Sequence, residues 1–104
     1  MARINLEKLT LRSMHSGHLC LELTEVIGWH QFPRFAEELM LMIGASIRDK
    51  AEGVDFYIWR LEFPTCQIRL VYEDFPNMIS LESDTLLGDE FLRKLAEQLK
   101  TPSA

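Results

Sequence analysis

GWHQFPRFAEELMLMIGASIRDK, residues 28–50, is the stretch around which the rest of the chain can be arranged. At about 100° per residue, apolar side chains gather on one side of a helix drawn through it and charged side chains on the other. The apolar members are Phe32, Ala36, Leu39, Met40, Ile43 and Ile47. Pro33 suits the first turn of a helix and Gly53 suits its end. The pattern predicts an amphipathic helix over residues 32–51 that lies across a sheet.

Alternating apolar and polar residues predict strands on both sides of this helix. Two short strands flank the turn at residues 14–17 and form a hairpin. Past Gly53, strands are expected in VDFYIWRLEF, CQIRLVYE and MISLES. A last amphipathic helix should begin near Asp84 or Asp89. The expected fold is therefore α+β, in the order β-β-α-β-β-β-α, with a mostly antiparallel sheet of about five strands and two helices packed on one face.

The 104-residue chain suits one core, so we expect a single domain over residues 1–100 and a disordered tail at residues 101–104. The formal net charge is −5, and no run of Lys and Arg is present, so no nucleic-acid partner is expected. No apolar run has the length of a membrane span, and the opening MARINLEKLTLRS lacks the apolar core of a secretory signal. A cytoplasmic protein without a membrane partner is expected, with Cys20 and Cys66 as free thiols.

Two breaks between strands, LEFPTC at residues 61–66 and YEDFPN at residues 72–77, accompany this element order. Together they resemble small gammaproteobacterial proteins that are grouped as families of unknown function. The resemblance covers most of the chain and implies a bacterial origin. Because no activity is attached to such families, it implies no functional residues.

His15, His18 and Cys20 form the cluster with the greatest chemical potential, since imidazole nitrogen and thiolate are good zinc ligands. Strand alternation would place His18 and Cys20 on one face, within reach of His15 in the turn. The HxxHxC spacing is not a recognised zinc spacing, and polar turn histidines beside a half-buried cysteine are the alternative. No metal or other cofactor is expected. A metal-dependent or thiol enzyme using these three residues is kept as an alternative function.

The segment VDFYIWRLEF is apolar on both faces of the expected strand. If the helices cover the face of Phe56 and Ile58, then Tyr57, Trp59 and Leu61 point outward. If the helices cover the other face, those three residues belong to the core. Trp, Tyr and Arg are enriched in interface hot spots, because they combine large buried area with a polar group. The candidate interface therefore comprises Tyr57, Trp59, Leu61, Arg69 and Val71.

The function expected from these patterns is non-enzymatic: self-association as a homodimer, or binding of a protein partner, through an open sheet face. One form of this hypothesis is a small acidic protein that shields a basic partner, because the net charge is negative. A small-molecule binding module is the remaining alternative, with a pocket near Trp29, Phe32 and Phe75 at the helix entry and the second break.

Overall fold

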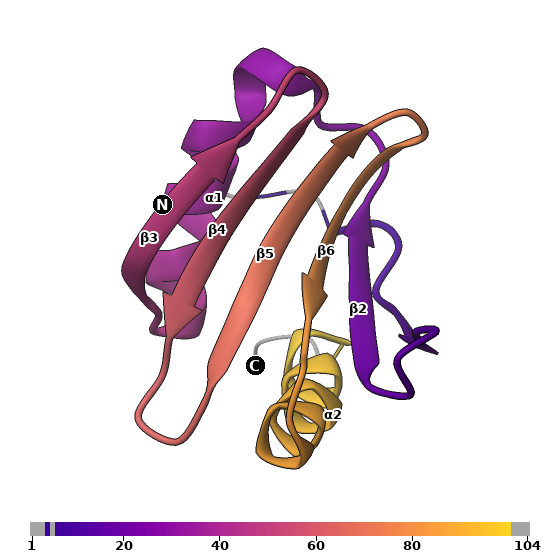
Figure 1. The fold of residues 1–104 in the computed structure, drawn as a ribbon, viewed down its shortest axis with the longest axis vertical. Helices are drawn as coiled ribbons and strands as arrows, with labels where there is room; N and C mark the ends of the chain where they lie inside the picture. The colour runs from indigo at the N-terminus through magenta and orange to yellow at the C-terminus, as the bar shows by residue number, and fades with distance from the viewer. Residues whose placement is uncertain (1–3, 5, 101–104) are drawn as a thin grey trace.

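The computed structural model describes residue 4 and residues 6–100, so the tail expected at residues 101–104 lies outside the described residues. Within this part, six strands form one antiparallel sheet in the order β1-β2-β6-β5-β4-β3 (Figure 1). Their bounds are β1 (Thr10–Ser13), β2 (Leu19–Thr24), β3 (Ser46–Glu52), β4 (Phe56–Glu62), β5 (Gln67–Asp74) and β6 (Asn77–Glu82). A short 3-10 helix, η1 (Trp29–Gln31), leads into α1 (Phe32–Ile43), and α2 (Leu86–Lys100) follows β6. The α+β class is confirmed, with six strands where about five were expected.

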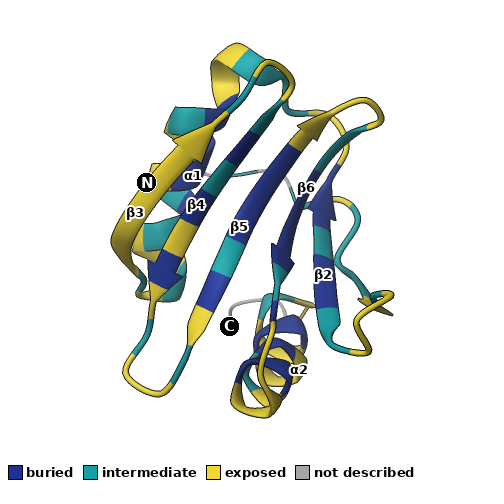
Figure 2. Ribbon diagram, viewed as in Figure 1, coloured by how far each residue is buried: buried dark blue, intermediate teal, exposed yellow. Residues whose placement is uncertain are grey.

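The helix expected over residues 32–51 is too long, because α1 ends before Gly44. Gly44 adopts the left-handed conformation, with φ 75°, and its N–H donates to the Met40 carbonyl oxygen. A glycine ends helices in this way because left-handed backbone meets no steric penalty without a Cβ atom. The chain then forms the edge strand β3, in which every residue is exposed (Figure 2). Gly53, expected to end the helix, lies in the β3–β4 turn instead.

One hydrophobic core lies between the two helices and one face of the sheet. Burying a Leu, Ile or Phe side chain contributes about 1.5–3 kcal/mol, so this layer holds the helices on the sheet. In Figure 2 buried residues alternate with more exposed ones along β4, as a sheet with one covered face requires. The core includes Leu21, Leu23, Phe32, Phe35, Leu39, Leu61, Ile68, Leu70, Ile79, Leu81, Leu92 and Leu95.

A polar network ties the β5–β6 hairpin to the loop that precedes η1. The fully buried Tyr72 donates its hydroxyl hydrogen to Asn77 Oδ1 at 2.6 Å and also contacts Asp74 Oδ1 at 3.1 Å. Asn77 Nδ2 in turn donates to the backbone carbonyls of Glu25 and Ile27, at 2.7 and 2.8 Å. Burial and the hydrogen bond with Asp74 raise the pKa of Tyr72 to about 12. The hydroxyl therefore stays protonated, and the network fixes the hairpin tip at the end of the sheet to the loop before η1.

Candidate functional site

The candidate functional surface is the sheet face that the helices leave uncovered. Side chains alternate between the two faces of a strand, so Ile58 points away from the helices while its neighbour Trp59 points into the core. The antiparallel register places Ile58 opposite Val71 and Phe56 opposite Glu73. The helix-free face therefore has an apolar row where β4 and β5 meet.

The outward orientation expected for Tyr57, Trp59 and Leu61 is wrong. Their side chains are only 8%, 4% and 0% exposed, and all three belong to the core beneath the helices. Tyr57 stacks between two aromatic rings, with centroid distances of 4.2 Å to Trp29 and 4.7 Å to Phe32. Large rings with such partners fill the space under η1 and α1, so they are not free to bind a partner.

Arg69 and Val71, the other two residues of the candidate interface, lie on the helix-free face. The register pairs Val71 with Ile58 and Arg69 with Arg60, which puts both on the face opposite Trp59. The expected group of five is thus divided between the two sides of the sheet. Of the five, only Arg69 keeps a partly exposed side chain, because Val71 is 7% exposed and offers little surface to a partner.

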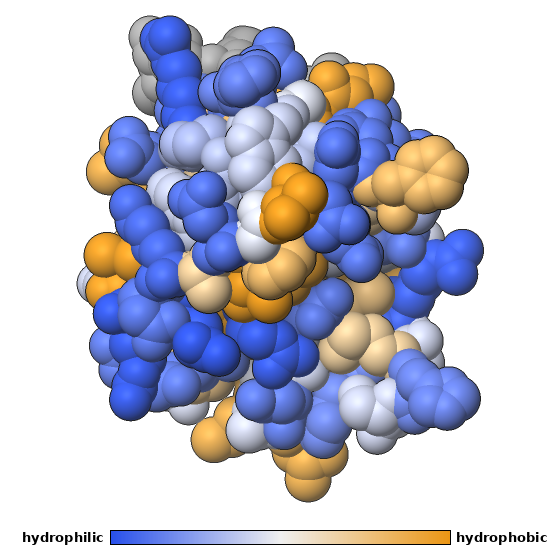
Figure 3. All heavy atoms as spheres, turned by 45° about the horizontal axis from the view of Figure 1, so that its top comes forward, coloured by the Kyte–Doolittle hydropathy of each residue, from blue (hydrophilic) through white to orange (hydrophobic). Residues whose placement is uncertain are grey.

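A shallow hollow of about 200 Å³ lies at the turn end of this face. Ile58 and Val71 form its apolar floor between two hairpin tips, and an N–H···O bond of 2.9 Å from Asp74 to the Asp55 carbonyl joins those tips. Figure 3 brings this end of the sheet towards the viewer and shows apolar side chains standing among hydrophilic ones. The lining residues are Asp55, Phe56, Ile58, Val71, Glu73 and Phe75.

The hairpin tips expose two large apolar side chains beside the hollow. Phe75 is 94% exposed and Val54 is 99% exposed. The Phe56 ring, by contrast, lies against the backbone of Gly53, where an added Cβ atom would collide with the ring. Gly53 is therefore the residue that lets Phe56 form one wall of the hollow.

The charged side chains on the rest of this face are paired with one another. Arg60 pairs with Asp49 at 2.8 Å, and Arg69 pairs with Glu82 and Asp84, each at 3.3 Å. These ion pairs leave little uncompensated charge on β3–β6 at the end of the sheet opposite the hollow.

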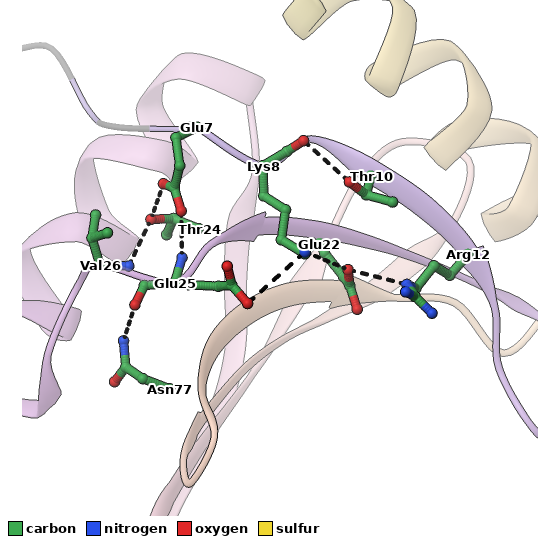
Figure 4. A network of polar contacts seen from close by, with 9 residues as sticks. All are labelled: Glu7, Lys8, Thr10, Arg12, Glu22, Thr24, Glu25, Val26 and Asn77. Atoms are coloured by element: carbon green, nitrogen blue, oxygen red, sulfur yellow. Dashed lines mark hydrogen bonds and ion pairs between the residues drawn. The ribbon is translucent and has the colours of Figure 1, made fainter.

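A second ionic network covers the β1–β2 side (Figure 4). Glu22 is approached by Arg12 at 3.2 Å and by Lys8 at 3.6 Å, and Lys8 also lies 3.9 Å from Glu25. Glu7 accepts hydrogen bonds from the Thr24 hydroxyl and from the Glu25 backbone N–H. The N-terminal segment is fixed to β2 by these contacts.

The hollow differs from both networks. The side chains of Asp55 and Glu73 make no hydrogen bond and no ion pair with other residues in the described part of the chain, and both are exposed.

His15, His18 and Cys20 are not assembled into one site. His18 Nδ1 lies 2.9 Å from Asp89 Oδ2 of α2, so its ring is held towards the helix, whereas Cys20 belongs to the row on the helix-free face. His15 is exposed in the β1–β2 turn. Over residues 4 and 6–100, no group of three or more His, Cys, Asp or Glu side chains is placed to hold a metal ion.

Asp89 is the residue that sequence reasoning missed beside His18. Its other carboxylate oxygen accepts the Leu19 backbone N–H at 2.9 Å, so Asp89 fastens the first turn of α2 to the start of β2. The Leu19 N–H bond, together with the His18 contact, lowers the pKa of Asp89 to about 2. No local signal links residues 71 positions apart in the chain, and only the packing of α2 on β2 brings them together.

Both cysteines are free thiols, as expected. Burial, with the neighbouring Glu22 and Glu82 carboxylates, raises the pKa of Cys20, and burial also raises the pKa of Cys66. Because the thiolate is the nucleophile, a raised pKa lowers the reactivity of both groups near neutral pH.

The aromatic residues proposed to line a small-molecule pocket are separated by the sheet. Phe32 is fully buried, and Trp29 stacks on Tyr57 on the helix side. Phe75 lies instead at the exposed hairpin tip beside the hollow.

A sequence model of the family described as "Protein of unknown function (DUF3630)" matches residues 9–100. The chain therefore belongs to this family, which confirms the expected membership of a family of unknown function. Searches of curated proteins and of solved structures returned no match. None of the helices in the described residues is long and apolar enough to cross a membrane.

Proposed function

We propose that this DUF3630 protein is a non-enzymatic interaction domain that binds a protein through the hollow on the helix-free face of its sheet. The observation that carries the proposal is the apolar hollow lined by the partly exposed Ile58 and the 7% exposed Val71, beside the 94% exposed Phe75. Apolar surface rimmed by polar groups is typical of protein contact sites. Covering a Phe side chain contributes about 1.5–3 kcal/mol, so a partner that covers Phe75 gains substantial binding energy.

The size and shape of the hollow favour a protein over a small molecule. Small-molecule pockets usually enclose roughly 300–1,000 Å³ and bury most of the ligand. A hollow of about 200 Å³ that is open along a sheet face instead suits one side chain of a larger surface. Arg69 lies on the same face, but its guanidinium already pairs with Glu82 and Asp84, so the proposed contact does not depend on it.

The rival enzymatic functions have less support. The three residues proposed as metal ligands or nucleophile do not converge on one site: His15, His18 and Cys20. The raised pKa of Cys20 also opposes thiol catalysis. The setting we propose is the cytoplasm of a bacterium, following the composition and the resemblance described above. A second copy of the chain and an unrelated protein are the two classes of partner that crosslinking separates.

Photo-crosslinking in cells tests the proposal. A photoreactive residue placed at Phe75 should give a discrete crosslinked product, and the same residue at Leu41 should not. Leu41 is a matched control because it is 86% exposed but belongs to α1 on the covered side of the sheet. The product should disappear when Ile58→Asp is introduced, with circular dichroism confirming the fold.

The mass of the product identifies the class of partner. A product at twice the chain mass indicates self-association, and any other discrete mass indicates a second protein. Equal crosslinking at Phe75 and Leu41, or a Phe75 product that survives Ile58→Asp, would refute binding through the hollow.

A further inference from the structure

We infer that the hollow takes a cationic amphipathic segment of another protein: an apolar side chain seated on Ile58 and Val71, flanked by Lys or Arg residues that pair with Asp55 and Glu73. This inference rests on the proposed function and specifies the chemistry of the partner.

The charged side chains around the hollow differ from those on the rest of the helix-free face. Elsewhere on the helix-free face, basic side chains already have acidic partners: Arg60 with Asp49, and Arg69 with Glu82 and Asp84. Asp55 and Glu73 have no such partner within the described residues, although they line the same apolar hollow. The uncompensated charge at this site is therefore negative.

Binding of a partner would remove water from the carboxylates beside the hollow. A partner that covers Ile58 and Val71 removes water from the two adjacent carboxylates, and a charge that loses water without a counter-charge costs free energy. Lys and Arg supply that counter-charge and donate hydrogen bonds to carboxylates. A neutral or acidic segment would leave Asp55 and Glu73 dehydrated and unpaired.

A second copy of the chain does not meet this requirement. Two hollows placed face to face would bring four carboxylates together, and each chain has a formal net charge of −5. The arginines of the same face are already held by acidic neighbours. Electrostatic complementarity thus favours a basic partner of different sequence, and it also speeds the encounter.

Four capped peptides of equal length serve as probes, with binding followed through the backbone amide signals of isotope-labelled full-length protein. Three share a central Phe-Leu pair flanked by Lys, Gln or Glu. The fourth has Lys flanks around Gly-Ser in place of the apolar pair. The Lys-flanked apolar peptide should shift the amide signals of residues 53–58 and 71–75 to saturation, and it should bind more weakly at high salt. The Glu-flanked and Gly-Ser peptides should shift none.

Two charge variants make the test specific. Glu73→Gln should raise the Kd of the Lys-flanked peptide about two- to fivefold, the effect of one ion pair at an exposed site. Glu37→Gln removes the same charge from α1 on the covered side and should leave Kd unchanged. Asp55→Asn provides a second variant in the neighbouring turn, with amide spectra confirming that each variant is folded.

The possible failures are distinguishable. Equal Kd values for the Lys-flanked and Gln-flanked peptides, or an unchanged Kd in Glu73→Gln, would overturn the charge inference while the crosslink at Phe75 still supports the proposed function. Amide shifts that depend on protein concentration without peptide would show a second copy in the hollow and would also overturn it. No response to any peptide rejects the inference, and the crosslinking experiment decides the proposed function independently.

Discussion

Replacing Trp59 and its neighbour Ile58 in turn tests which face of the sheet is covered. Trp59 is 4% exposed, its ring meets Phe32 edge to face at 5.4 Å, and Lys50 Nζ lies 4.2 Å from its centroid. Truncating a buried aromatic residue to Ala usually costs about 3–5 kcal/mol, because the cavity closes only in part. Small domains have about 5–15 kcal/mol in total, so Trp59→Ala should remove a large share of the stability.

Ile58 is one position away but opens onto the hollow, and its side chain is already partly exposed. Ile58→Ala should therefore cost less than about 2 kcal/mol. At about 4–8 °C per kcal/mol for a domain of this size, the Tm of Trp59→Ala should fall by at least about 12 °C.

Urea unfolding followed by far-ultraviolet circular dichroism measures both variants, and equal m-values confirm that the same surface is exposed on unfolding. If Ile58→Ala costs as much as Trp59→Ala, or more, the assignment of the covered face is refuted.

Two further predictions concern the start of α2. Gly88→Ala should destabilise the protein, although Gly to Ala in a helix normally gains about 0.5–1 kcal/mol, because the new Cβ atom would collide with the buried Ser83 hydroxyl. Chemical denaturation should show partial recovery in the Ser83→Ala/Gly88→Ala double variant; a stabilising Gly88→Ala would contradict the packing. The pKa of Asp89 is about 2 in the folded protein, against an ordinary value of 3.8. The ionised carboxylate therefore stabilises the fold fully above pH 3.8, and this stabilisation is lost as the pH falls towards 2. Between about pH 5 and 2 the free energy of unfolding should thus fall more steeply in wild type than in Asp89→Asn, and parallel acid titrations would argue against this role.

The sequence of β4 does not show which of its faces the helices cover, because the side chains on both faces are apolar. The sequence of β5 does show it. In β5, Ile68, Leu70 and Tyr72 alternate with more polar neighbours, apart from Val71. The turn after β4, closed by the Phe63 N–H bond to the Cys66 carbonyl, then places Trp59 opposite Leu70. A reading of the two strands as one hairpin would have assigned Trp59 to the core.

The end of α1 was misplaced for a different reason. Ile47 continues the helical stripe by coincidence, so periodicity alone passes through Gly44 without a signal to stop. The helix ends there because Gly44 adopts the left-handed conformation, and residues 46–52 then pair with β4 as the edge strand. The His18–Asp89 contact was beyond reach, since its partners meet only through the packing of distant elements.

The edge strand β3 protects the protein from uncontrolled polymerisation. Its seven residues are all exposed, and four of them, Arg48, Asp49, Lys50 and Glu52, are charged. The pairing with β4 is also irregular between Ile47 and Asp49. Another strand that docked there would have to dehydrate these charges and match an irregular register. Natural sheets use both features, charged edge residues and β-bulges, to prevent edge-to-edge growth. The chain can therefore display an apolar hollow on the face of its sheet while its β3 edge opposes fibre growth.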